Sequence, residues 1–200
     1  MINLLKIEWL KIKNYTAFIV MTLFFIVGVF ALNYIVFTVN KNIVNNVPGA
    51  GLVSFSPYDF ANTWQSTSYA TGFILLLPAL LLLMLFTNEY TFKTHRQNII
   101  DGLSRQQFIS VKIMMALIFA MAATLLVIIS ALIFGFGSGT AFSLNGFIFV
   151  GYFFLKALSY NLIAILFSVL VKRTGFAIGI FFIYLGSENI VSQLLNVLSM

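Results

Sequence analysis

Long apolar runs that contain at most one charged residue constrain this chain more than any other feature. A helix needs about 20 predominantly apolar residues to cross the hydrocarbon core of a bilayer. Four runs reach this length, at residues 15–40, 69–88, 113–136 and 146–171. Pro78 lies inside the second run, and proline is tolerated in a membrane helix where neighbouring groups satisfy the freed carbonyl. We therefore predict four membrane-spanning helices.

The composition excludes a soluble fold. Of the 200 residues, 61% are hydrophobic and 8% are charged, whereas about 25% of residues are charged in an ordinary soluble domain. The mean hydropathy of +1.04 agrees with this. The absence of cysteine excludes disulfides, thiolate metal sites and a cysteine nucleophile. The expected fold class is all-α, a polytopic membrane helix bundle.

The positive residues are distributed unevenly. Nine of the eleven lysines and arginines lie in three segments that the predicted spans place on one side of the membrane. These are Lys6, Lys11, Lys13, Lys93, Arg96, Arg105, Lys112, Lys172 and Arg173. The positive-inside rule then places the N-terminus in the cytoplasm. The net charge of +6 is thus explained by membrane orientation, and we expect no nucleic-acid partner.

Lys156 is the one positive residue inside a predicted span. A central lysine costs about 3 kcal/mol on insertion, and each Leu, Ile, Phe or Val returns about 0.3–0.6 kcal/mol, so the run 146–171 still inserts. Tyr160 follows one turn later. The two side chains line a translocation path or a dimer interface, or else the lysine extends to the outer headgroups.

A fifth apolar run, residues 175–186, is too short to cross a membrane, since it makes about 18 Å of helix. The following residues, 187–200, mix polar and apolar side chains. We predict a short or re-entrant span followed by an amphipathic segment at the outer interface. The alternative is one continuous tilted helix with Glu188 facing protein.

The first 14 residues have the pattern of a helix lying on the membrane surface. Apolar residues recur at Ile2, Leu5, Trp9 and Ile12, and lysines lie on another face. Trp9 and Lys11 are the expected interfacial anchors. The alternative is that the first span simply begins early.

The segment 89–112 contains an ordered series of signals. Phe92, His95, Ile99, Ile100 and Leu103 share one face, which is mostly apolar, and this predicts a short amphipathic helix. Gly102 is a residue type that ends helices. Ser104 and Gln107 then match a capping box that opens the next helix. A loop that is merely charged would not need a helix, a glycine that ends it and a capping box in succession. We therefore predict that this segment is a docking element.

These residues resemble the permease subunits of ABC-2-type transporters. In that family a glutamate near the end of the second span, a G-T-x-R-like segment, an S-R pair and a lysine mark the cytoplasmic loop. The matching residues here are Glu89, Thr94, Arg96, Ser104, Arg105 and Lys112. Lys93 stands where the family often has glycine. The segment Ile7–Lys11 resembles the interfacial N-terminal helix of the family.

The resemblance implies a six-span permease of the bacterial cytoplasmic membrane, with both ends cytoplasmic. Two copies, or one copy and a paralogue, would assemble with two ABC ATPase subunits that hold the ATP and magnesium. The loop helix would be the coupling helix, seated in a groove of the ATPase. Its expected residues are Glu89, Phe92, Thr94, Arg96, Asp101, Gly102, Ser104, Arg105 and Lys112. The chain stops where a sixth span would begin.

The sequence has no motif for chemistry of its own. It lacks G-x-x-x-x-G-K-[ST] and H-E-x-x-H, and its one histidine is His95 in the loop. We expect no catalytic residue, metal site or bound cofactor. The leading interpretation is the permease subunit of an exporter driven by ATP hydrolysis on a partner. A secondary transporter or channel, or a non-transporting membrane assembly factor, are the alternatives. No residue selects a substrate.

Overall fold

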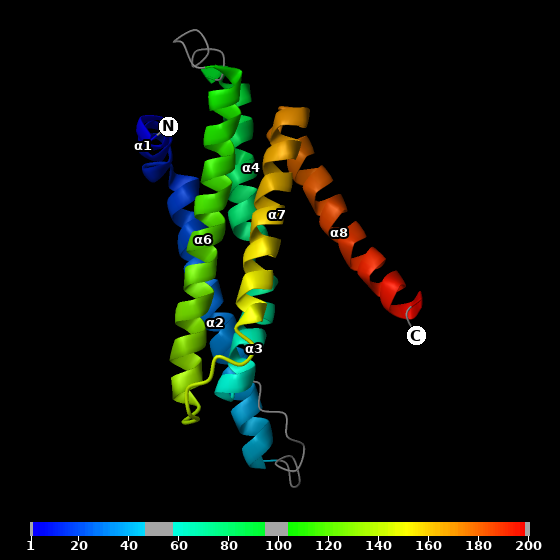
Figure 1. Ribbon diagram of the computed structural model, residues 1–200. Coiled ribbons are helices and arrows are strands. Elements are labelled where there is room, and N and C mark those ends of the chain that lie inside the picture. The colour runs from blue at the N-terminus through cyan, green and yellow to red at the C-terminus, as the bar shows by residue number, and fades with distance from the viewer. Residues whose placement is uncertain (1, 47–57, 95–103, 199–200) are drawn as a thin grey trace.

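The computed structural model describes residues 2–46, 58–94 and 104–198, and every regular element within those ranges is a helix (Figure 1). There are seven such helices. They are α1 (Ile2–Lys13), α2 (Thr16–Asn46), α3 (Phe60–Gly72), α4 (Leu76–Thr91), α6 (Arg105–Gly137), α7 (Ile148–Val171) and α8 (Thr174–Leu198). The expected all-helical class is therefore confirmed. The first helix, α1, is separate from α2 rather than an early start of the same helix.

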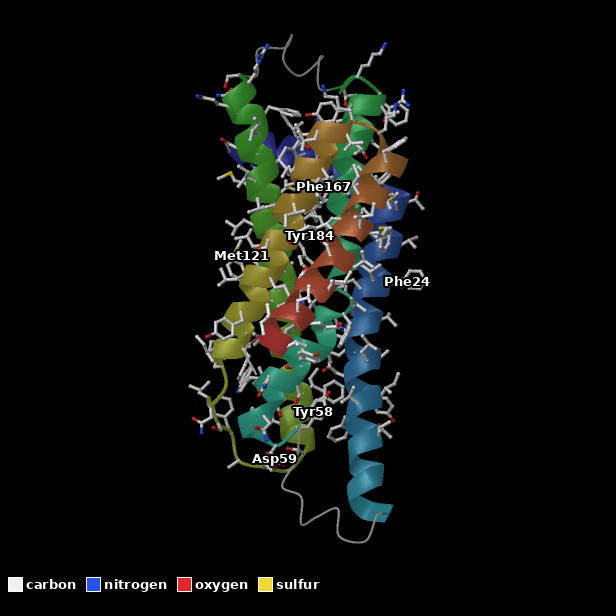
Figure 2. All side chains as sticks on the ribbon, turned by 90° about the vertical axis from the view of Figure 1, so that its right-hand side faces the viewer. Phe24, Tyr58, Asp59, Met121, Phe167 and Tyr184 are labelled. Carbon is white, nitrogen blue, oxygen red and sulfur yellow. The ribbon has the colours of Figure 1, made fainter. Side chains whose placement is uncertain are left out.

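Three helices, α2, α6 and α7, are long and apolar enough to cross a membrane, and α3 with α4 makes a fourth if the bent pair is one span. Large apolar side chains cover the outside of the bundle. Phe24 and Met121 point away from it on opposite sides, with 64% and 44% of their surfaces exposed (Figure 2). A surface of this kind is stable in lipid and not in water. The chain is a helical membrane protein.

The run 69–88 does not form one straight span, contrary to our expectation. Instead α3 ends at Gly72, α4 begins at Leu76, and the two helices meet at an angle of 42°. The cause is Pro78, whose ring excludes the α-helical bond to the carbonyl of Ile74. That carbonyl accepts from Leu77 N at 3.0 Å instead. Pro78 lies in the first turn of α4. Backbone N–H groups in the first turn of a helix have no acceptor within that helix, so α4 loses no hydrogen bond to the proline.

The polar helix α3 begins well before the expected span. Two of its threonine hydroxyls donate hydrogen bonds to backbone carbonyls four residues earlier. Thr63 Oγ1 donates to Asp59 O at 2.9 Å and Thr67 Oγ1 donates to Thr63 O at 2.8 Å. Trp64 Nε1 donates to Ser143 O at 2.8 Å and joins α3 to the α6–α7 connection. These bonds let a threonine-rich helix lie buried in the bundle.

The centre of the bundle is α7, which packs along α4 and α6. Small residues make close approach of these helices possible, because they leave room between the backbones. The fully buried examples include Ala116, Ala120, Ala131, Ala157 and Ala164. Larger side chains fill the space between them, such as Leu83 from α4 and Phe181 from α8.

The C-terminal part is one continuous helix of 25 residues, α8. The expectation of a short run followed by a separate amphipathic segment is wrong, and the continuous helix that we kept as an alternative is what the structure has. Lys172 makes the turn that precedes it, with φ at 57°. From there α8 diverges from α7 (Figure 1). Polar residues do not break α8, and Glu188 accepts a hydrogen bond from α7.

Candidate functional site

A buried lysine joins three helices at the end of the bundle where α1 lies. Lys112 Nζ, from α6, donates to Glu8 Oε2 of α1 at 3.0 Å and also to Glu89 Oε1 near the end of α4. Only 3% of the Lys112 side chain is exposed. The ammonium charge of Lys112 is therefore surrounded almost entirely by protein groups and not by solvent.

Aromatic rings and a second lysine complete the arrangement. Lys112 Nζ lies 4.3 Å from the ring centre of Phe86 and 5.0 Å from that of Phe108, so the rings add cation–π attraction. Lys11 Nζ is 3.1 Å from Glu8 Oε1. We call Glu8, Lys11, Glu89 and Lys112 the ion-pair network. Its two lysines balance its two glutamates, which lowers the cost of burying them.

Helix α1 places Glu8 for this contact. Glu8 and Lys11 are three residues apart and so lie on one face. Ile12, on the same side, is 3% exposed and packs among Phe86 and Met115. Burial raises the pKa of the Glu8 carboxyl, but the ammonium groups of Lys112 and Lys11 outweigh burial and leave this pKa below its ordinary value. Glu8 is therefore ionised at neutral pH.

The structure brings two of the expected loop residues, Glu89 and Lys112, into direct contact. Glu8 was missed as their partner, although it is the one acidic residue among the lysines of the N-terminal segment. The capping box is confirmed: Gln107 N donates to Ser104 Oγ at 3.2 Å and Ser104 N donates to Gln107 Oε1 at 3.1 Å. It opens α6 as expected.

The other expected loop residues that the structure describes are not gathered into one cluster. Phe92 is 73% exposed and Arg105 is exposed, while Thr94 Oγ1 donates to Glu89 O at 3.3 Å. Three more expected residues lie outside the described part of the chain. They are Arg96, Asp101 and Gly102.

Lys93 adopts the backbone conformation that favours glycine. Its φ is 57°, in the left-handed region that most side chains avoid. The chain thus forms a left-handed turn after α4 although the residue at this position is lysine. This is the position at which ABC-2-type permeases often have glycine.

The two anchors expected at the membrane surface, Trp9 and Lys11, both have exposed side chains but lie on different sides of α1, because positions two residues apart are about 200° apart on a helix. Trp9 is 49% exposed and its ring meets Phe18 edge-on at 5.8 Å. Lys11 has a side chain that is 40% exposed. An exposed tryptophan and an exposed lysine suit a helix that lies in the headgroup region.

A second set of ionisable groups lies midway along α7 and α8. Lys156 is exposed on α7, with Nζ 5.4 Å from the ring centre of Tyr160. Tyr160 OH donates to Glu188 Oε2 of α8 at 2.8 Å. No partner for Glu188 could be predicted from the sequence, because a contact between residues 28 positions apart leaves no local pattern.

Within the described residues, no three His, Asp or Glu side chains lie close enough together to hold a metal ion. Comparison of the chain with protein-family models, with curated proteins and with solved structures found no match. The functional interpretation therefore rests on the geometry of the ion-pair network and on the loop sequence that it encloses.

Proposed function

We propose that this chain is the membrane-spanning permease subunit of an ABC exporter of the ABC-2 type. In this proposal it lies in the bacterial cytoplasmic membrane, pairs with a second permease copy or paralogue, and moves a substrate outward. ATP hydrolysis takes place on separate ATPase subunits that bind the cytoplasmic loop. The chain itself holds no ATP.

One observation carries the proposal: Lys112 joins both ends of the loop segment 89–112. Glu89 is the first residue of this segment and Lys112 is the last, and the two are in contact. Glu8 adds α1 to the same point. A partner that moves the loop would thus move α4, α6 and α1 together, because separating the buried charges would cost several kcal/mol of free energy.

The loop sequence supplies what such a partner would bind. Its sequence has an apolar face, a basic face and a glycine stop, which together are typical of an amphipathic docking element. The basic ends of α1 and α6 and the turn between α7 and α8 lie at the same end of the bundle (Figure 1). The positive-inside rule assigns that end to the cytoplasm, where ATP is available.

The test is purification of the tagged chain from membranes of its own host in a mild detergent. An ATPase subunit should co-purify in stoichiometric amount, and a photo-crosslinking residue at Phe92 should join the two. A matched crosslinker at Phe142, in the α6–α7 connection, should not. Absence of any ATPase from intact membrane complexes would contradict the proposal.

Secondary transport is the second candidate, and one observation favours it. Lys156 and Glu188 are linked through Tyr160 on two neighbouring helices, and ionisable groups within membrane helices often serve ion-coupled transport. Transport that follows an ion gradient without ATP would support this candidate over the exporter.

A further inference from the structure

A cavity of about 430 Å³ opens between α3 and α7 and is closed on one side by α8. Gln65, Ser68 and Gly72 line it from α3, Tyr152 and Lys156 line it from α7, and Leu185 lines it from α8. Aromatic side chains make up much of the remaining wall. The volume is within the range of about 300–1,000 Å³ that small-molecule sites have.

Lys156 supplies the charge of this cavity. None of the ion pairs in the described part of the chain includes it. Its contact with protein is the face of the Tyr160 ring, which attracts a cation but does not neutralise it. Glu188 forms no ion pair with Lys156 among the described residues and accepts a hydrogen bond from Tyr160 OH instead. An exposed ammonium that has no ion-pair partner among the described residues and lies beside an apolar wall is available to an anionic ligand.

The position of Lys156 along α7 indicates how a ligand arrives. It lies eight residues from the outer end of the helix at Ile148, a rise of about 12 Å. A lysine side chain bridges much of that depth by extending toward the headgroups. The ligand would then keep its charged head near the outer interface and its apolar part deeper in the cavity.

The wall of the cavity fits hydrocarbon better than a free ion. Tyr69 of α3 and Phe73, the residue that follows α3, meet edge-on at 5.4 Å, and both have most of their surface exposed. Ser68 adds a buried hydroxyl without a hydrogen-bond partner among the described residues. A change of its rotamer would let it donate to a headgroup oxygen.

We propose that this cavity binds one anionic phospholipid of the bilayer, with its phosphate on Lys156 and an acyl chain along the aromatic wall. The binding is an equilibrium property of the chain alone and goes beyond transport. It does not depend on an ATPase partner, so its failure and the failure of the exporter proposal are distinguishable.

The test is native mass spectrometry of the intact chain in detergent, titrated with phosphatidylglycerol, with phosphatidylcholine of the same acyl chains, and with inorganic phosphate. We expect one phosphatidylglycerol per chain, bound at least about tenfold more tightly than phosphatidylcholine. Inorganic phosphate should not compete at lipid concentrations, because it lacks the hydrocarbon that the wall contacts.

Two pairs of variants locate the site. Lys156→Gln removes the charge and should abolish the preference for phosphatidylglycerol, whereas Lys172→Gln removes an exposed lysine elsewhere and should preserve it. Gly72→Leu fills the cavity, since no atom lies within 4 Å of a Cβ at this position. It should weaken binding at least about tenfold. Gly151→Leu, equally unobstructed but outside the cavity, should not.

Several results would overturn the proposal. If Lys156→Gln and Lys172→Gln lowered the preference for phosphatidylglycerol equally, the preference would come from a general attraction between lysines and anionic lipid. Equal binding of the two lipids would exclude a charge-selective site. A stable dimer that covers the cavity and is broken by Gly72→Leu would identify the occupant as a second copy of this chain.

Discussion

Lys112 Nζ lies 3.0 Å from Glu8 Oε2, although 104 residues separate the two in the sequence. The same ammonium contacts Glu89, so α1, α4 and α6 meet at one buried charge. Breaking one partner of such a group is far more costly than breaking an exposed ion pair, because the remaining charges stay buried. This contact should therefore dominate the stability of this end of the bundle.

The first prediction concerns Lys112→Met. It leaves Glu8 and Glu89 without their shared cation and should lower the free energy of unfolding by about 3–5 kcal/mol. The control is Lys11→Gln, whose side chain is 40% exposed and whose loss should cost at most about 1 kcal/mol. Unfolding by SDS in mixed micelles, followed by circular dichroism, measures both.

A triple variant separates charge from packing. Lys112→Met combined with Glu8→Gln and Glu89→Gln removes all three charges and should regain most of the lost stability, because neutral replacements of buried ion pairs are often tolerated. If the triple variant stays as unstable as Lys112→Met, the loss comes from packing and not from charge.

The second prediction is a pH dependence through Glu8. Its pKa is lower in the folded protein than the ordinary value, so its contribution to stability is complete above the unfolded pKa of about 4.3. The contribution is lost as the pH falls through the folded pKa. The stability difference between the wild type and Glu8→Gln should thus be constant from pH 7 to 5 and shrink below pH 4. A difference that grows on acidification would contradict this.

The third prediction concerns Gly135 in α6. A Cβ at this position would lie 2.9 Å from Phe60 Cζ, closer than packed atoms allow. Gly135→Ala should therefore destabilise the fold by about 1–3 kcal/mol. Gly151→Ala on α7, where a Cβ meets nothing within 4 Å, should instead stabilise it by about 0.5–1 kcal/mol. Adding Phe60→Leu should reduce the cost of Gly135→Ala if the ring is the obstacle.

The fourth prediction concerns the left-handed turn before α8. Lys172 has φ at 57°, a conformation that costs a non-glycine residue about 1–2 kcal/mol. Lys172→Gly should raise the thermal midpoint, with a net gain of about 1 kcal/mol after the greater freedom of glycine in the unfolded chain is subtracted. Lys172→Ala keeps the strain and should bring no such gain.

The fifth prediction tests the coupling loop. Arg96→Glu or Gly102→Leu should uncouple ATP hydrolysis from transport while the chain still inserts into the membrane. Arg96→Lys keeps the charge and should lose less activity. ATPase and transport assays on the same reconstituted complex measure the ratio of the two rates. Unchanged ratios in both variants would remove the loop from the coupling mechanism.

Local patterns predicted the parts of the structure that depend on neighbouring residues. The Ser104–Gln107 capping box spans three positions, and the apolar runs of α2, α6 and α7 show in composition alone. The helical membrane class followed from these runs. The break at Pro78 was underestimated because a proline inside an apolar run does not show whether neighbouring helices let the chain continue straight.

The contacts that build the candidate site lie beyond local patterns. Lys112 counted as one positive charge in a basic flank, and nothing in its neighbourhood shows that it is 3% exposed. The partnership of Tyr160 with Glu188 likewise depends on the angle between α7 and α8. For the same reason, the sequence left open whether Glu188 lies in a surface segment or in a continuous helix with its side chain facing protein, and the structure has the continuous helix.

The long separation of Glu8, Glu89 and Lys112 also sets an order of events during protein synthesis. Both glutamates leave the ribosome before Lys112, and the interval after Glu89 is 23 residues, or about 1–5 s of translation. Until then α1 and α4 bring two like charges toward one place, which opposes their docking. The emergence of α6 removes that repulsion, so the nascent chain assembles this end of the bundle only once α6 begins to form.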